Sequence, residues 1–195
     1  MPRPLRRERR VDRRARGGTV TIEWHGSRLG FRRATHECTP EVLSVLDEAA
    51  AWLMARGISQ WPARFQAAWV EEAISRGETW LVGLGEETAG TVTLDWQDRV
   101  WADVGGTAGY IHRLAVRRWA TGLGSIVLDW AAVRARQRGV AALRLDCVRS
   151  NHRLRSYYEE RGFRHRGDVP VGGAPGQRLE DGPVTWVSRY ELSIP

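Results

Sequence analysis

Residues 109–125 read Gly-Tyr-Ile-His-Arg-Leu-Ala-Val-Arg-Arg-Trp-Ala-Thr-Gly-Leu-Gly-Ser, and this stretch decides the fold. Its first half is rich in β-forming apolar residues and predicts a strand over 109–116. Its second half is a glycine-rich turn, after which apolar residues at helical spacing predict a helix that ends at Gly139. A strand entering a helix through such a turn directs free backbone N–H groups at one point, which suits a phosphate.

The turn alone does not identify a ligand. A Rossmann dinucleotide site needs a third glycine, and that position is Val127. A P-loop needs Gly-Lys followed by Ser or Thr, and the chain contains no lysine. A tight connection without any ligand is therefore the alternative to a phosphate site.

The following elements make the pattern specific. Residues 142–148 alternate apolar with charged side chains and predict a second strand. Residues 151–163, Asn-His-Arg-Leu-Arg-Ser-Tyr-Tyr-Glu-Glu-Arg-Gly-Phe, predict a short helix that ends at a glycine. This order of elements resembles the GNAT acetyltransferase superfamily. The family sequence Asn-x6-Tyr-x3-Gly-Phe falls without a gap on Asn151, Tyr158, Gly162 and Phe163.

The resemblance extends over about residues 28–193 and implies an α/β GNAT fold, with a mixed, strongly twisted sheet flanked by helices. In that fold the strands ending at Val116 and Val148 splay apart, and the pantetheine arm of acetyl-CoA lies between them. The resemblance thus implies acetyl-CoA as co-substrate. The expected organisation is a disordered basic arm over 1–18 and one acetyltransferase domain over 19–195.

The resemblance also implies that the backbone of the turn binds the CoA pyrophosphate. The family motif Gln/Arg-x-x-Gly-x-Gly/Ala starts here with Trp119, so its first side chain is lost, and Arg117 or Arg118 would replace that contact. Asn151 either caps its helix or bonds the pantetheine amide. The expected cofactor-binding residues are Leu114, Ala115, Val116, Arg117, Arg118, Thr121, Gly122, Leu123, Gly124, Ser125 and Asn151.

Acetyl transfer from a thioester to an amine needs a deprotonated amine and a proton for the leaving thiolate. Tyr158 matches the family's general acid, and its alternative role is that of a core aromatic. His112 occupies a position where many family members carry a glutamate base, and a histidine can act as a base near neutral pH. The alternative is a histidine satisfied within the sheet. Asp95 and Glu191 are weaker candidates for the base.

Two helices are expected before the central stretch, the first capped by Thr39 and ending at Gly57, the second over 63–75. Trp61 and Phe65 lie between or at the start of these helices, where the family builds its acceptor wall; ordinary core packing is the alternative. A hairpin is expected from 80–83 and 90–96 and a last strand over 183–192, whereas 167–182 is expected to be a loop.

The formal charge of +7 is concentrated at the N-terminus. Residues 1–16 hold eight arginines against Glu8 and Asp12, which leaves the rest of the chain at about +1. This arm is either a solvated leader or a nucleic-acid-binding arm, and the second is disfavoured because no aromatic residue interleaves its arginines. No apolar run approaches membrane-spanning length and no signal-peptide core follows the basic start, so we expect a cytoplasmic protein without a membrane partner.

The sequence therefore predicts an N-acetyltransferase that moves acetyl from acetyl-CoA to a primary amine of a small molecule or protein by direct attack. Cys38 and Cys147 are lone thiols outside the expected site, so neither a covalent acetyl-enzyme nor a metal site is expected. Two alternatives are an acyl-CoA sensor without turnover and a nucleic-acid-binding protein led by the arm. The acceptor, and the choice between monomer and homodimer, stay open.

Overall fold

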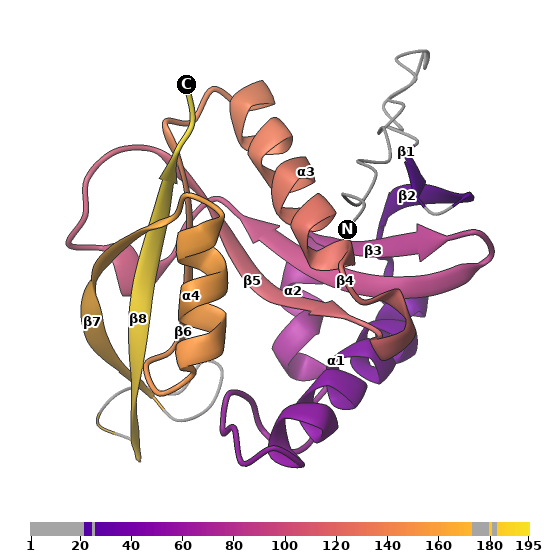
Figure 1. Cartoon of the computed structure of the whole chain (residues 1–195), viewed down its shortest axis with the longest axis horizontal. Helices are drawn as coiled ribbons and strands as arrows, with labels where there is room; N and C mark the ends of the chain where they lie inside the picture. Colours follow the sequence, from indigo (N-terminus) through magenta and orange to yellow (C-terminus); the bar gives the residue numbers. More distant parts are fainter. Residues whose placement is uncertain (1–21, 25, 173–179, 181–182) are drawn as a thin grey trace, which may run out of the picture.

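The computed structural model describes residues 22–24, 26–172, 180 and 183–195, so the predicted arm lies outside the described residues. One eight-stranded sheet runs through it in the order β1-β2-β3-β4-β5-β6-β8-β7. β5 and β6 are parallel, and the other neighbouring strands are antiparallel. In Figure 1 the strands turn from nearly horizontal at β3 to nearly vertical at β8. The sheet is thus mixed and strongly twisted, as predicted.

The predicted helices, hairpin, central strands and last strand all form. The first half of the chain forms β1 (Ile22–Trp24), β2 (Ser27–Arg33), α1 (Thr39–Met54), α2 (Ala68–Ser75), β3 (Thr79–Leu84) and β4 (Glu87–Asp95). The second half forms β5 (Ala108–Val116), α3 (Leu123–Gln137), β6 (Ala142–Val148), α4 (His152–Glu160), β7 (Arg164–Gly172) and β8 (Val184–Ser193). Short 3-10 turns also lie between these elements, at His36–Cys38, Arg99–Trp101 and Arg118–Ala120.

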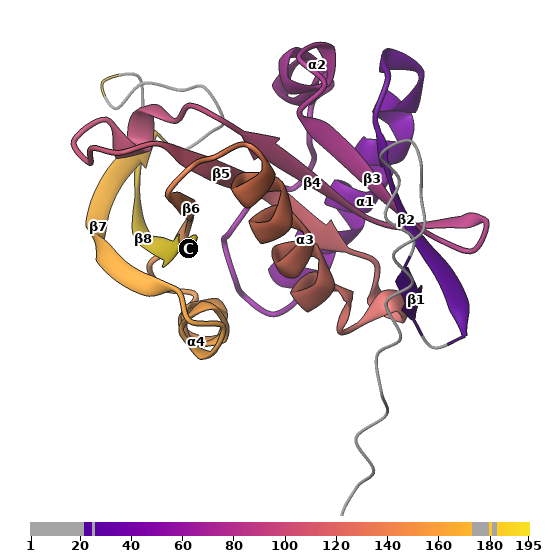
Figure 2. The same ribbon diagram turned by 90° about the horizontal axis from the view of Figure 1, so that it is seen from above.

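Helices cover both faces of the sheet (Figure 2). α3 and α4 pack on one face over the larger apolar core, where Phe31 stacks on Trp130 with ring centroids 4.5 Å apart. α1 and α2 pack on the other face over a smaller core that includes Val45 and Leu81. Among the described residues, no helix is both long and apolar enough to span a bilayer.

The contact between β5 and β6 is short. Their pairing begins at Ala108 and Ala142 and ends at Ile111 and Leu145. Beyond that last pair the two strands diverge, as Figure 1 shows between β5 and β6. We call this point the fork. It confirms the predicted splay of the strands that end at Val116 and Val148.

The two helices on the α1–α2 face start differently from the prediction. A 3-10 turn precedes α1, so its N-cap is Cys38 and Thr39 already belongs to the helix. α2 begins at Ala68 rather than at residue 63. The backbone N–H of Phe65 donates instead to the Asp47 carboxylate of α1 at 2.8 Å, and this side-chain partner replaces a first helical turn.

The predicted loop over 167–182 is wrong for its first part, because β7 continues to Gly172 and pairs with β8. β7 is the edge strand, so Pro170, which has no N–H to donate, is tolerated there. The register shifts between His165 and Asp168, where Gly167 has a φ of +97°. Gly167 resembles a strand breaker in the sequence, but here it lies in a β-bulge, and the strand continues beyond it.

Candidate active site

The glycine turn joins the end of β5 to α3 and leaves the start of that helix uncapped. Gly122, the N-cap, is left-handed with a φ of +99° and has no side chain to satisfy the first helical N–H groups. The hydroxyls of Thr121 and Ser125 donate to the carbonyl oxygens of Arg118 and Gly122 at 2.7 and 2.9 Å. Both hydroxyls thus close the turn, and the free backbone N–H groups give it the donors that a diphosphate needs.

Gly124 is the place where the turn has least room. A Cβ atom there would meet the Tyr157 hydroxyl at 3.3 Å and a Leu114 methyl at 3.9 Å. Tyr157 packs against the larger core, and its hydroxyl reaches the turn. Leu123 is fully buried and anchors the first turn of α3.

The two arginines before the turn have different surroundings. The Arg117 guanidinium donates to Glu48 of α1 at 2.6 Å and to Ser44 at 3.0 Å, so its donors are already engaged. Arg118 is exposed, and its guanidinium lies 4.3 Å from the Trp52 ring centroid. Burial works to raise the pKa of Glu48, but the hydrogen bonds from the Arg118 N–H and from Arg117 outweigh it and lower that pKa. Of the two, Arg118 keeps free donors for an anion.

Leu114, Ala115 and Val116 form the end of β5 beyond the fork. Ala115 and Val116 pair with Thr91 and Gly90 of β4, but the strand has no β6 partner from residue 112 onward. The peptide groups on that edge are therefore available to an extended ligand lying between the strands.

Asn151 caps α4, as one of its two predicted roles requires. Its Oδ1 accepts from the Leu154 N–H at 3.2 Å. Its Nδ2 donates at 3.2 Å to Oε1 of Gln60, which also accepts from the Val148 N–H at 3.3 Å. Gln60, in the segment between α1 and α2, thus closes the far end of the splay, and sequence reasoning did not find it.

Tyr158 lies in the core behind the splay. Its side chain is 7% exposed and its ring neighbours Tyr157, Phe163 and Tyr190 at centroid distances of 5.7, 5.8 and 6.0 Å. Burial, followed by the charges of Cys147 and Asp146 among others, raises the pKa of Tyr158. Its hydroxyl has no hydrogen-bond partner among the described residues, and it stays protonated at any working pH. It can give a proton but cannot serve as a base.

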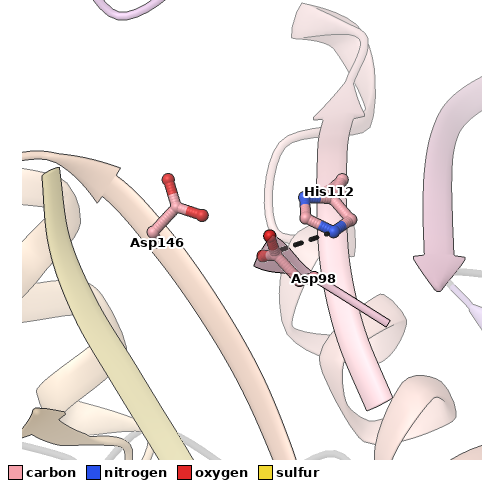
Figure 3. A group of neighbouring side chains, drawn as sticks. All are labelled: Asp98, His112 and Asp146. Carbon is pink, nitrogen blue, oxygen red and sulfur yellow. Dashed lines mark ion pairs between the residues drawn. The ribbon is translucent and has the colours of Figure 1, made fainter. Parts of the chain in front are cut away.

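His112 does not stand alone. Its Nε2 lies 3.7 Å from Oδ2 of Asp98, and donor atoms of Asp98, His112 and Asp146 all lie within 4.8 Å of one another. Figure 3 shows Asp146 projecting from β6 toward the imidazole on β5. Burial raises the pKa of Asp146 to about 6, with His112 lowering it and Asp98 raising it further. We call these three residues the fork cluster.

The other candidates for the base are engaged in ion pairs. Asp95 accepts from the Arg76 guanidinium at 3.0 Å and from the Trp96 N–H at 2.8 Å. Glu191 accepts from Arg144 at 2.7 Å. Both carboxylates are already occupied by arginine partners, so the geometry favours the fork cluster as the source of a base.

Trp61 and Phe65 pack against each other with perpendicular rings, 5.5 Å between centroids. Phe65 is buried and belongs to the core beneath α1 and α2, whereas Trp61 is partly exposed beside it. Core packing therefore accounts for Phe65, and Trp61 keeps a surface that an acceptor can contact.

Neither thiol is placed for covalent chemistry. Cys147 is fully buried on the α3–α4 face of the sheet, and burial with the nearby Asp146 charge raises its pKa to about 12. Cys38 lies before α1, where its sulfur accepts from Arg32 at 3.1 Å. Both cysteines are free.

Asp98 and Asp146 were missed by sequence reasoning because they lie far apart in the chain. Asp98 caps the 3-10 turn at Arg99–Trp101 by accepting from the Val100 N–H at 2.9 Å, and that turn is anchored by the buried Trp101. Asp146 is the charged position of an alternating strand, a pattern that normally marks an outward-facing side chain. The sequence patterns around Asp98 and Asp146 indicate only local structure, and they do not show that the two side chains lie close together at the fork.

Comparison with known proteins agrees with this geometry. Residues 46–163 match the model of the acetyltransferase (GNAT) family. The chain is 32% identical over 163 residues to an uncharacterized N-acetyltransferase, YesJ, of Bacillus subtilis strain 168, covering 78% of this chain and 88% of that protein.

Solved structures share the fold. A GNAT-family acetyltransferase from Listeria monocytogenes superimposes with a TM-score of 0.70 at 23% identity, covering 89% of this chain and 99% of that chain. The structure of yncA from Salmonella typhimurium, solved with its cofactor acetyl-CoA, gives a TM-score of 0.57 at 13% identity, covering 86% and 94% of the two chains.

Proposed function

The chain belongs to the acetyltransferase (GNAT) family, and from that premise we propose that it transfers acetyl from acetyl-CoA to a primary amine by direct attack. It is an acyltransferase with acetyl-CoA as its co-substrate. The proposal adds the acceptor class, the route of transfer and the residues that act.

The observation that carries the proposal is the uncapped start of α3 beside the splay. Gly122 leaves the first N–H groups of α3 without a side-chain partner, and Arg118 adds a positive charge nearby. These groups would bind the CoA diphosphate. The unpaired edge of β5 from residue 112 onward would bind the pantetheine arm by backbone hydrogen bonds. Because backbone groups supply most of these contacts, the loss of the family's first motif side chain at Trp119 leaves the site intact.

Tyr158 would supply the proton that the departing thiolate needs. Its burial keeps the phenol neutral, and its hydroxyl is not committed to another described residue. His112, at the fork, would help to remove the proton of the incoming amine. Direct attack is favoured over a covalent acetyl-enzyme because the Cys147 thiol is fully buried and its burial raises its pKa, which keeps it protonated.

The acceptor is a primary amine of a small molecule or of a protein. Trp61 beside the splay favours an amine with apolar bulk next to the reacting nitrogen. A panel of benzylamine, tryptamine, spermidine and peptides with free N-termini covers both classes.

The test is turnover of acetyl-CoA by the full chain against this panel, with release of the free thiol as the signal. We expect at least one amine to stimulate thiol release above hydrolysis, with mass spectrometry showing one added acetyl group. Tight acetyl-CoA binding without turnover of any amine would instead favour an acyl-CoA sensor. Absence of acetyl-CoA binding would overturn the proposal.

A further inference from the structure

The fork places two side chains in an unusual position. Ile111 and Leu145 form the last pair between β5 and β6, and the next residues on the two strands are His112 and Asp146. Both therefore stand where the strands begin to part. On β6, Leu145 and Cys147 belong to the core under α3 and α4, so Asp146 faces the opposite side of the sheet.

Asp146 is a carboxylate without a committed partner. It is partly buried, and it accepts no hydrogen bond from any residue in the described part of the chain. The cross-strand neighbour on β8 is Arg189, but that guanidinium is bonded to Asp103 at 2.5 Å and to the Val100 carbonyl at 3.0 Å. Within the described ranges no arginine neutralises Asp146, which leaves its oxygens able to receive a cation or a proton.

Asp98 is held more firmly than Asp146, because it has a hydrogen-bond partner. Its side chain is 9% exposed, one oxygen caps the 3-10 turn, and the other is buried without a hydrogen-bond partner and directed at His112 (Figure 3). Two carboxylates thus flank one imidazole, with no other charged side chain acting on Asp146 from the elements around it. Because the two carboxylates lie close together, the set favours binding of a cation or a proton between them.

We propose that Asp146 is a further catalytic residue, the carboxylate that takes the proton of the acceptor ammonium, and that Asp98 is a positioning residue that fixes the His112 ring beside it. The inference rests on the proposed amine acetylation. It assigns the fork cluster to recognition of the acceptor as a cation and to the first proton transfer.

The proton balance is complete. Asp146 accepts one proton from the ammonium and passes it through His112, which is 26% exposed, to solvent. The neutral amine then attacks the thioester carbon, so that a C–N bond forms and the C–S bond breaks. Tyr158 gives its proton to the departing sulfur and is reprotonated by the second proton of the attacking nitrogen. The net products are the amide, the free thiol and one proton.

The raised pKa of Asp146, about 6, suits this task. A base whose pKa lies just below the working pH is ionised there and still binds a proton strongly. Asp98 contributes to the raised value, so removing its charge should lower the Asp146 pKa.

The kinetic test uses Asp146→Asn in the full chain with an amine that the wild type acetylates. We expect kcat to fall by about 10²–10⁴-fold, while the Kd for acetyl-CoA is unchanged. His112→Gln should lower kcat as well. Asp98→Asn keeps an oxygen for the Val100 N–H but loses the charge, and should move the acidic limb of the pH–rate profile to lower pH. Glu86→Gln, in the exposed turn between β3 and β4, is the matched control.

A measurement that needs no acceptor is the carboxyl ¹³C titration of Asp146 in the free protein. We expect a midpoint near pH 6 that is absent from Asp146→Asn. A midpoint near 4, or wild-type kcat in Asp146→Asn, would overturn the inference while leaving amine acetylation standing. Calorimetry with Zn²⁺ and Mn²⁺ adds a second check, since micromolar binding coupled to metal-dependent turnover would replace the base with a cation site.

Discussion

The glycine turn and the fork cluster lie at opposite ends of the β5 segment that follows the last β6 pair, and they are built in opposite ways. The turn consists of consecutive residues, 121–125, and offers mainly backbone N–H groups. The fork cluster gathers three side chains from residues 98, 112 and 146, each supplied by a different element. A site made of backbone tolerates changes of side chain, whereas a site made of side chains depends on every element that delivers them.

This difference predicts a separation of effects. Variants of the turn should change the affinity for acetyl-CoA and leave kcat at saturation intact. Variants at or near the fork should change kcat and leave that affinity intact. Four experiments test the separation, from the largest expected effect to the smallest.

Tyr158→Phe should lower kcat by about 10²–10⁴-fold, the usual cost of losing a positioned proton donor. The ring and its packing against Phe163 and Tyr190 are kept, so the Kd for acetyl-CoA and the melting temperature should stay at wild-type values. Steady-state kinetics with chemistry shown to be rate-limiting, together with calorimetry, makes the measurement. A wild-type kcat in Tyr158→Phe would show that Tyr158 only packs in the core.

Gly124→Val should weaken acetyl-CoA binding by about 10–100-fold, because hydrogen bonds to a charged group contribute roughly 1.5–3 kcal/mol each. Calorimetry measures the loss. Gly30→Val is the control, since a Cβ atom there would meet no atom within 4 Å. The double variant with Tyr157→Phe removes the hydroxyl that a new Cβ would meet. Full recovery in the double variant would mean that crowding of Tyr157, rather than a blocked phosphate site, caused the loss.

Asp146→Asn should change how stability depends on pH. The pKa of Asp146 in the folded protein, about 6, lies above the ordinary pKa of an aspartate, so ionisation of Asp146 opposes folding. The wild type should therefore lose roughly 2 kcal/mol of unfolding free energy from this group between pH 4 and pH 7. Urea unfolding at both pH values should show a smaller loss in the variant. Parallel pH dependence in the two proteins would show that Asp146 ionises freely in the folded state.

Deletion of residues 1–18 should change neither the melting temperature nor turnover, because a segment of this charge without an apolar face adds nothing to either region. Thermal unfolding and the thiol assay provide the comparison. Tight, salt-dependent nucleic-acid binding that the deletion abolishes would give the arm a function of its own.

The same contrast explains what the sequence could predict. β5, the turn, α3, β6 and α4 follow from local patterns and a contiguous motif, and all five appear where expected. A site made of consecutive backbone groups can be recognised from a contiguous sequence motif. The partnership of His112 with Asp98 and Asp146 depends on the register of β5 against β6 and on the burial of Trp101, which no local pattern reports.

The errors in the fold have a similar origin. The Asp47 carboxylate of α1 accepts a hydrogen bond from the backbone N–H of Phe65, and α2 begins only after this residue. Pairing with β8 holds residues 164–172 in a strand despite Gly167 and Pro170. In both places a partner distant in sequence outweighs the local preference. Gln60 was missed for the same reason, since its two donors come from β6 and the start of α4.

The alternation of inward- and outward-facing residues along β6 also limits which insertions and deletions the sequence can tolerate. Odd-numbered residues from Leu143 to Cys147 face the α3–α4 core, and even-numbered ones face the other side. A one-residue slip of β6 against β5 and β8 would reverse this parity, sending a carboxylate into the core and a leucine to the fork. A single-residue insertion or deletion within β6 would therefore move Asp146 away from His112. The placement of the reactive carboxylate thus depends on the pairing register of one strand.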